Sequence, residues 1–139
     1  MAQGIPLTDA DRWDWLTLLR EEATRRLALG DQGVVLTCSA LKRKYRDVIR
    51  VASYFSHDVL VHFVYLHATE EVLLRRVGAR KNHFMRADMV HSQFEALEEP
   101  DASETDVLTV DVSGSIEEVE QEALAKIKLA VQRELVYVS

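Results

Sequence analysis

Helical and strand-like hydrophobic patterns alternate along this chain. Short apolar runs at 34–38, 59–66 and 107–110 are typical of strands that are buried on both faces. Apolar positions with helical spacing predict helices that follow Thr8, Ser39, Thr69, Ala87 and Ser115. Alternating strands and helices indicate an α/β fold with a mostly parallel sheet and right-handed crossovers.

Polar residues mark the predicted helix starts. Thr8 with Asp11, and Ser115 with Glu118, have the spacing of a capping box. Thr69 precedes two glutamates, which favour the positive end of a helix dipole. Gly30 provides a stop for the first helix.

Composition fits a single globular domain spanning residues 1–139. Hydrophobic residues make up 47% of the 139 positions and charged residues 29%, and we find no repeat or linker. No apolar run approaches the roughly 20 residues of a membrane span, so no membrane partner is expected. We see no signal peptide, and we therefore expect a cytoplasmic location. The single cysteine, Cys38, cannot form an internal disulfide, which fits a reducing compartment without proving one.

Charge is distributed unevenly. The net charge of −6 argues against a nucleic-acid partner. Ten of the 17 basic residues lie within 42–50 and 75–86, whereas 88–122 holds twelve acidic residues and no basic one. Local basic clusters in an acidic protein are typical of a site for a small anion. Two solvated helix faces would give the same pattern, and charge alone leaves both interpretations open.

Three segments contain candidate chemistry. The segment 38–47 follows a predicted strand and opens a helix, where Lys42 and Arg46 favour an anion. Cys38 and Ser39 lack the surroundings of a nucleophile, so a packed thiol and a helix cap explain them better.

The basic segment after residue 75 suits a phosphoryl-transfer lid, because Arg76 and Arg80 share one helix face. A basic surface loop is the alternative. In the third segment, Asp9 and Asp11 fit helix-dipole partners better than metal ligands, and Arg12 is a candidate for binding a carboxylate.

These segments together resemble the gluconate kinase (gluconokinase) family. The matching motifs run in order through most of the chain: Gly4-x-Pro6-Leu7-x-Asp9-x-Asp11-Arg12-x-x-Trp15-Leu16, Cys38-Ser39-Ala40-Leu41-Lys42-x-x-Tyr45-Arg46-Asp47, Phe63-x-Tyr65-Leu66, Arg76-x-x-x-Arg80-x-x-His83-Phe84 and Ser92-Gln93-Phe94-Glu95-x-Leu97-Glu98-x-Pro100. The resemblance implies a three-layer P-loop kinase fold. It also implies transfer of the ATP γ-phosphoryl to the 6-hydroxyl of D-gluconate with Mg²⁺, and often a homodimer.

The resemblance also implies roles for individual residues. A lid at about 80–88 would carry Arg80 against the transferring phosphoryl and the nucleotide, with Arg76 on the nucleotide as well. The loop at Val112 and Ser113 would lie against the adenine. The sugar-acid pocket would be formed by Arg12, Lys42, Arg46, His83 and Gln93.

The chain departs from the family pattern in one important respect. No G-x-x-x-x-G-K-S/T motif occurs, although this loop cradles the phosphates and supplies a Mg²⁺ ligand in the family. Smaller departures are Asp14, Ala68 and Asn82. We therefore expect an N-terminally truncated domain that lacks the first strand, the P-loop and the first helix. Its sheet should show a gap between 34–38 and 59–66 or a forced pairing of these strands, and its fold should be marginal.

Three functional hypotheses follow. The first is a truncated gluconokinase whose chain alone is inactive. The second is a catalytically dead homologue that binds a sugar acid or a partner. The third is a kinase site that is completed by another chain.

Overall fold

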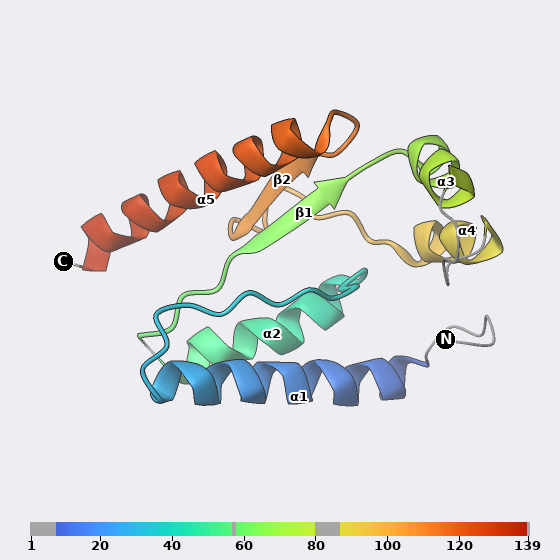
Figure 1. Cartoon of the computed structure of the whole chain (residues 1–139). Helices are drawn as coiled ribbons and strands as arrows, with labels where there is room; N and C mark the ends of the chain where they lie inside the picture. Colours follow the sequence, from blue (N-terminus) through green and yellow to red (C-terminus); the bar gives the residue numbers. More distant parts are fainter. Residues whose placement is uncertain (1–7, 57, 80–86, 139) are drawn as a thin grey trace.

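The computed structural model describes residues 8–56, 58–79 and 87–138. Figure 1 shows a parallel sheet between helix α5 on one face and the α1–α2 pair on the other, which confirms the expected layered α/β class. The elements are α1 (Asp9–Ala28), α2 (Arg43–Phe55), β1 (Phe63–His67), α3 (Glu70–Ala79), α4 (Ala87–Ala96), β2 (Val107–Asp111) and α5 (Ile116–Val138).

Strands β1 and β2 pair in parallel, with Phe63 opposite Val107 and His67 opposite Asp111. The Phe63 N–H donates to the Asp106 carbonyl at 2.9 Å, and the His67 carbonyl accepts from the Val112 N–H at 3.0 Å. In a parallel ladder, alternate residues of a strand bond to the same neighbour. The backbone N–H and C=O groups of the odd-numbered residues of β1 therefore point toward β2. Those of the even-numbered residues point away from β2, toward the opposite edge of the strand.

The strand predicted at 34–38 is wrong. This segment is assigned to no strand and forms a loop that lies beside β1 (Figure 1). Within the described ranges, no backbone hydrogen bond joins it to another segment. A buried apolar run becomes a strand only when a second backbone lies within hydrogen-bonding distance. The expected gap in the sheet is therefore what the described residues show, and the two segments are not forced together.

Two predicted boundaries also shift. The strand predicted at 59–66 occupies 63–67. The helix predicted to begin at Ser39 begins at Arg43, after an N-cap residue, Lys42, that makes no side-chain capping bond. The reason is local: the carbonyls of Ser39 and Ala40 accept hydrogen bonds from arginine side chains, and the Leu41 carbonyl accepts from a backbone N–H. These bonds hold 39–41 outside the helix.

The other predicted caps are confirmed. The Asp11 N–H donates to Thr8 Oγ1 at 3.2 Å, and the Val72 N–H donates to Thr69 Oγ1 at 3.2 Å. Ser115 Oγ accepts from the Glu118 N–H at 3.1 Å and donates to the Glu118 carboxylate at 3.0 Å. These polar residues position the start of each helix.

The main core is small and lies between α1 and α2. Its buried members are Leu16, Tyr45, Val48 and Ile49. Val61 and Phe63 pack against this cluster from the segment that leads into β1. None of the helices in the described ranges is both long and apolar enough to cross a bilayer.

Candidate functional site

Most of the predicted site residues that the structure describes lie at one end of the molecule. Figure 1 shows the carboxyl ends of β1 and β2 on the same side as the starts of α1, α2 and α5. Parallel α/β sheets bind their ligands at this end, because loops and helix N-termini converge there. Arg80 and His83 lie outside the described residues, as does most of the predicted lid.

Tyr45 organises a cluster of charges at the start of α1 and α2. Its hydroxyl donates to Asp9, which also accepts from Lys44 Nζ at 2.5 Å. Lys42 Nζ lies 3.8 Å from the Asp9 carboxylate and 5.8 Å from the centre of the Tyr45 ring. The Arg12 guanidinium lies 5.4 Å from the same centre. The structure thus brings together two predicted pocket residues, Arg12 and Lys42.

The protonation states of this Tyr45 cluster leave it positive. The hydrogen bond from Lys44, followed by that from Tyr45, lowers the pKa of Asp9 to about 2. Burial and the bond to Asp9 raise the pKa of Tyr45, so its hydroxyl keeps its proton. The Tyr45 cluster therefore combines three cations, Arg12, Lys42 and Lys44, with the single carboxylate of Asp9, and the excess positive charge favours a small anion.

Arg12 is itself held firmly. It is buried, and its Nη1 donates to the Ser39 carbonyl at 2.9 Å. This bond connects the first helix to the segment before α2. Arginine presents a planar fork of donors that suits a carboxylate, so its orientation matters for recognition.

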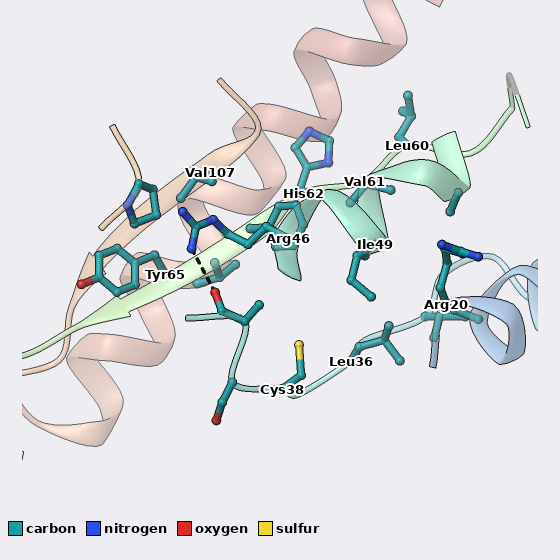
Figure 2. A pocket seen from close by; sticks show the side chains of 18 of the residues that line it. Arg20, Leu36, Cys38, Arg46, Ile49, Leu60, Val61, His62, Tyr65 and Val107 are labelled. Atoms are coloured by element: carbon teal, nitrogen blue, oxygen red, sulfur yellow. Dashed lines mark hydrogen bonds between the residues drawn. The ribbon is translucent and has the colours of Figure 1, made fainter. Parts of the chain in front are cut away.

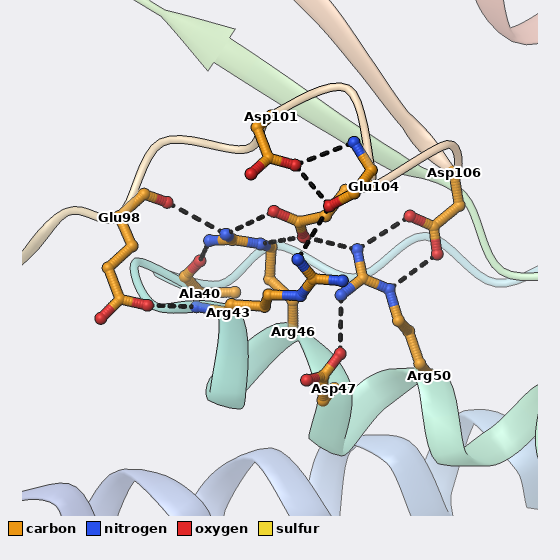
Figure 3. Close-up of polar contacts among 10 residues, drawn as sticks. Ala40, Arg43, Arg46, Asp47, Arg50, Glu98, Asp101, Glu104 and Asp106 are labelled. Atoms are coloured by element: carbon orange, nitrogen blue, oxygen red, sulfur yellow. Dashed lines mark hydrogen bonds and ion pairs between the residues drawn. The ribbon is translucent and has the colours of Figure 1, made fainter.

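Arg46 occupies a different environment (Figure 3). Its guanidinium binds both Glu104 carboxylate oxygens, at 2.7 and 2.8 Å, and donates to the carbonyls of Ala40 and Glu98 at 3.0 Å. Nε, Nη1 and Nη2 are all engaged inside the protein. The structure therefore shows Arg46 joining α2 to the 98–104 segment, and its contact with a ligand stays a prediction.

Arg50 extends this arrangement into the Arg46–Glu104–Arg50–Asp106 network (Figure 3). It contacts Asp106 at 2.8 Å and Glu104 at 2.6 Å. The hydrogen bonds from Arg46, first, and from Arg50 lower the pKa of Glu104 to about 2, although burial of the carboxylate acts in the opposite direction. Two of the five basic residues at 42–50, Arg46 and Arg50, are thus neutralised by the acidic segment, while Lys42 and Lys44 belong to the Tyr45 cluster.

Two of the residues predicted to bind the nucleotide, Arg76 and Val112, contact each other. Arg76 Nη2 donates to the Val112 carbonyl and lies 3.4 Å from the Gly114 carbonyl oxygen. The Ser113 N–H donates to Asp111 Oδ1 at 2.8 Å and lowers the pKa of that carboxyl. The end of α3 is thereby fixed against the loop before α5.

Gln93 lies on α4, half-buried. In the part of the chain that is described, no hydrogen bond joins it to Arg12 or Lys42. Sequence reasoning missed its neighbour His91, which lies 2.8 Å from Glu70 of α3 and 2.9 Å from Glu95. The only signal in the sequence was that His91 and Glu95 are four residues apart, which places them on the same face of a helix.

A groove of about 400 Å³ separates 34–41 from β1 (Figure 2). Its lining is mainly apolar and includes Cys38. Cys38 is an exposed residue, so its interpretation as a packed thiol is wrong, although partial burial of the sulfur raises the pKa of the thiol. Over the described ranges, the acidic, histidine and cysteine side chains form no group suited to a metal ion.

Comparisons with known proteins agree with this fold. No family model matches the chain. The chain is 47% identical over 125 residues to a probable gluconokinase of Schizosaccharomyces pombe, covering 89% of this chain and 64% of that relative. It is 39% identical to the thermoresistant gluconokinase of Escherichia coli, covering 92% of this chain and 70% of the relative.

A solved structure gives the same result. The crystal structure of a gluconokinase from Sinorhizobium meliloti 1021 superposes with a TM-score of 0.79 at 40% identity, covering 99% of this chain and 72% of the other. The fold is therefore that of a P-loop kinase-like α/β protein. The chain belongs to the gluconokinase family. It spans less than two thirds of the length of the S. pombe relative.

Proposed function

We propose that this chain provides the sugar-acid-binding part of a kinase that transfers the γ-phosphoryl group of ATP to the 6-hydroxyl of D-gluconate, giving 6-phospho-D-gluconate. The observation that carries the proposal is the positive Tyr45 cluster, in which Arg12 and Lys42 lie against one aromatic ring. Its place at the carboxyl end of the sheet suits a small carboxylate. Membership of the gluconokinase family supplies the substrate class.

In this proposal, Arg12 and Lys42 bind the gluconate carboxylate. Gln93 and His83 close the pocket over the hydroxyl groups. Arg46 contributes by holding the Ala40 and Glu98 carbonyls, which shape the segment that carries Lys42.

The nucleotide side of the proposal rests on Arg76 and the loop at Val112 and Ser113. Their contact gives a surface for the ATP base beside the start of α5. Arg80 would neutralise charge on the transferring phosphoryl. The described residues offer no set of ligands that fits Mg²⁺, so we assign no step to the metal. Since the sequence lacks the phosphate-cradling motif, we expect this chain alone to be inactive.

The proposal also includes the oligomeric state and the location: the protein forms a homodimer and acts in the cytoplasm.

Calorimetry with D-gluconate tests the pocket. We expect Lys42→Gln to weaken binding about tenfold, because a charge-assisted contact is worth roughly 1.5 kcal/mol. Arg12→Lys keeps the charge but loses the planar fork, so it should also weaken binding. Lys128→Gln, on α5, is the matched control and should bind as the wild type does.

Unchanged gluconate binding in both pocket variants would contradict the proposed role. A coupled assay of ADP formation tests the activity separately. Robust gluconate-dependent turnover by this chain would disprove the expected inactivity.

A further inference from the structure

The segment that follows α4 is attached to the start of α2. The Glu98 N–H donates to the Leu41 carbonyl at 2.7 Å, and Glu98 Oε1 accepts from the Arg43 N–H at 3.0 Å (Figure 3). One residue therefore holds the backbone on both sides of Lys42. Because adjacent Cα atoms are about 3.8 Å apart, the next residue, Glu99, lies beside the turn that carries Lys42.

Glu99 also reaches the carboxyl end of β1. Its Oε1 accepts a hydrogen bond from the Tyr65 hydroxyl at 3.0 Å, and His67 Nε2 lies 3.4 Å from the same oxygen. Tyr65 and His67 are two positions apart on a strand, so their side chains share one face of the sheet. Their rings meet edge to face with centres 5.6 Å apart, an arrangement that aromatic pairs favour. A packed pair of rings thus fixes one oxygen of the Glu99 carboxylate.

The second oxygen of Glu99 is in a different situation. In the part of the chain that the structure describes, no hydrogen bond or ion pair reaches Oε2, and Glu99 is exposed. Burial of Tyr65 and its bond to Glu99 raise the pKa of this phenol to about 12, so its hydroxyl keeps its proton and continues to donate. Glu99 therefore presents one anchored oxygen and one open oxygen, and a carboxylate oxygen accepts hydrogen bonds without donating any.

This open acceptor complements the nearby Tyr45 cluster. The excess positive charge of the cluster attracts an anionic group, whereas the Glu99 carboxylate disfavours a second anion and favours donors. A ligand that satisfies both has a carboxylate at one end and uncharged donors along the rest of its length. A polyhydroxylated open-chain acid has this composition.

We propose that Glu99 is a specificity residue that accepts hydrogen bonds from the hydroxyl groups on the carbon chain of the sugar acid. Tyr65 is the positioning residue that orients its carboxylate. The inference rests on the proposed function, which supplies the sugar acid. An analogue without these hydroxyl groups should bind poorly, because it displaces water from the acceptor without replacing the hydrogen bond.

Calorimetry with two ligands tests the specificity role. D-Gluconate has a hydroxyl group on every carbon beyond the carboxylate, whereas 6-hydroxyhexanoate keeps only the terminal one. We expect Glu99→Gln to weaken gluconate binding about tenfold, since a hydrogen bond to a charged group is lost, and not to weaken 6-hydroxyhexanoate binding. Glu120→Gln, the same change on the exposed surface of α5, is the matched control and should bind both ligands as the wild type does.

A double-variant cycle tests the positioning role of Tyr65. Tyr65→Phe keeps the ring and removes the hydroxyl that orients Glu99, so it should weaken gluconate binding about threefold. In the double variant with Glu99→Gln it should add nothing further, because both changes act through one carboxylate. Additive losses, or an equal loss with 6-hydroxyhexanoate, would overturn the positioning role.

The results separate this inference from the proposed function. If Lys42→Gln weakens binding of both ligands and Glu99→Gln weakens neither, the hydroxyl contact is wrong and the carboxylate site stands. If Glu99→Gln weakens both ligands equally, the specificity role is also wrong. If Glu99→Gln weakens gluconate alone while Lys42→Gln and Arg12→Lys have no effect, the specificity role holds and the assigned carboxylate site fails. Absence of gluconate binding by the wild type would overturn both.

Discussion

Glu104 lies between two guanidinium groups, and its carboxylate is only 2% exposed. Arg46 binds both of its oxygens, and Arg50 approaches one of them. Removing one partner of a buried ion pair leaves the other charge without compensation. Loss of the Glu104 carboxylate would therefore destabilise the fold mainly because it would leave the buried Arg46 guanidinium without a counter-charge.

We expect Glu104→Gln to lower the free energy of unfolding by about 3 kcal/mol, at the low end of the effect of breaking a buried ion pair. The measurement is urea-induced unfolding at neutral pH. Glu120→Gln, on exposed α5, is the control and should change stability by less than about 0.5 kcal/mol. A Glu104→Gln variant as stable as this control would contradict the assigned role.

The same residue predicts a pH dependence. The pKa of Glu104 falls from 4.5 to about 2 on folding, so its contribution is complete above about pH 4.5 and is lost as the pH drops toward 2. The difference in unfolding free energy between the wild type and Glu104→Gln should therefore shrink through this interval. A difference that stays constant between pH 5 and 2.5 would argue against the lowered pKa.

Motifs predicted the contacts of some residues and missed those of others. Arg12 and Lys42, and likewise Arg76 and the loop at 112–113, were each assigned to a shared site and do lie together. The attachment of Arg46 to Glu104 was not foreseen. These residues are 58 positions apart, and nothing in the local pattern of either one identifies its partner.

At the scale of elements, helix starts were predictable because a cap is a local interaction. Ser115 and Glu118 bond to each other across three residues, and the sequence alone contains that information. The run at 34–38 shows the opposite case. An apolar run indicates burial, but strand formation also requires a partner, and here no described backbone supplies one.

We expect Ser115→Ala to lower the free energy of unfolding by about 1 kcal/mol, since an N-cap hydroxyl satisfies a helix N–H that would otherwise be unpaired. Ser115→Thr keeps the hydroxyl and should stay close to the wild type. Thermal unfolding followed by circular dichroism provides the comparison. Equal melting temperatures for the alanine and threonine variants would show that the cap contributes nothing.

At the scale of the whole molecule, large apolar side chains remain at the surface. Val35 is 92% exposed, and Phe55 and Ile116 are each 78% exposed. Few side chains are fully buried by comparison, and Leu16 is one of them. Such a surface favours association with other apolar molecules. The marginal stability expected from the sequence stays a prediction.

We therefore expect the folded chain to bind an apolar fluorescent dye at neutral pH. The double variant Val35→Thr and Phe55→Ser should reduce the fluorescence while changing stability by less than about 1 kcal/mol, because both side chains are exposed. Leu16→Ala should instead destabilise the protein by about 3 kcal/mol and raise dye binding. Unchanged fluorescence in the double variant would place the dye elsewhere.

The Arg46–Glu104–Arg50–Asp106 network also has a consequence for cooperativity. It fastens the α1–α2 hairpin to the segment that leads into β2, whose strand packs on α5. The α1–α2 hairpin is held by contacts between its two helices, and β2 is held by β1 and α5. Weakening the network should therefore separate these two parts before either one unfolds. Acid near pH 2, which protonates Glu104, would then turn a single unfolding transition into two.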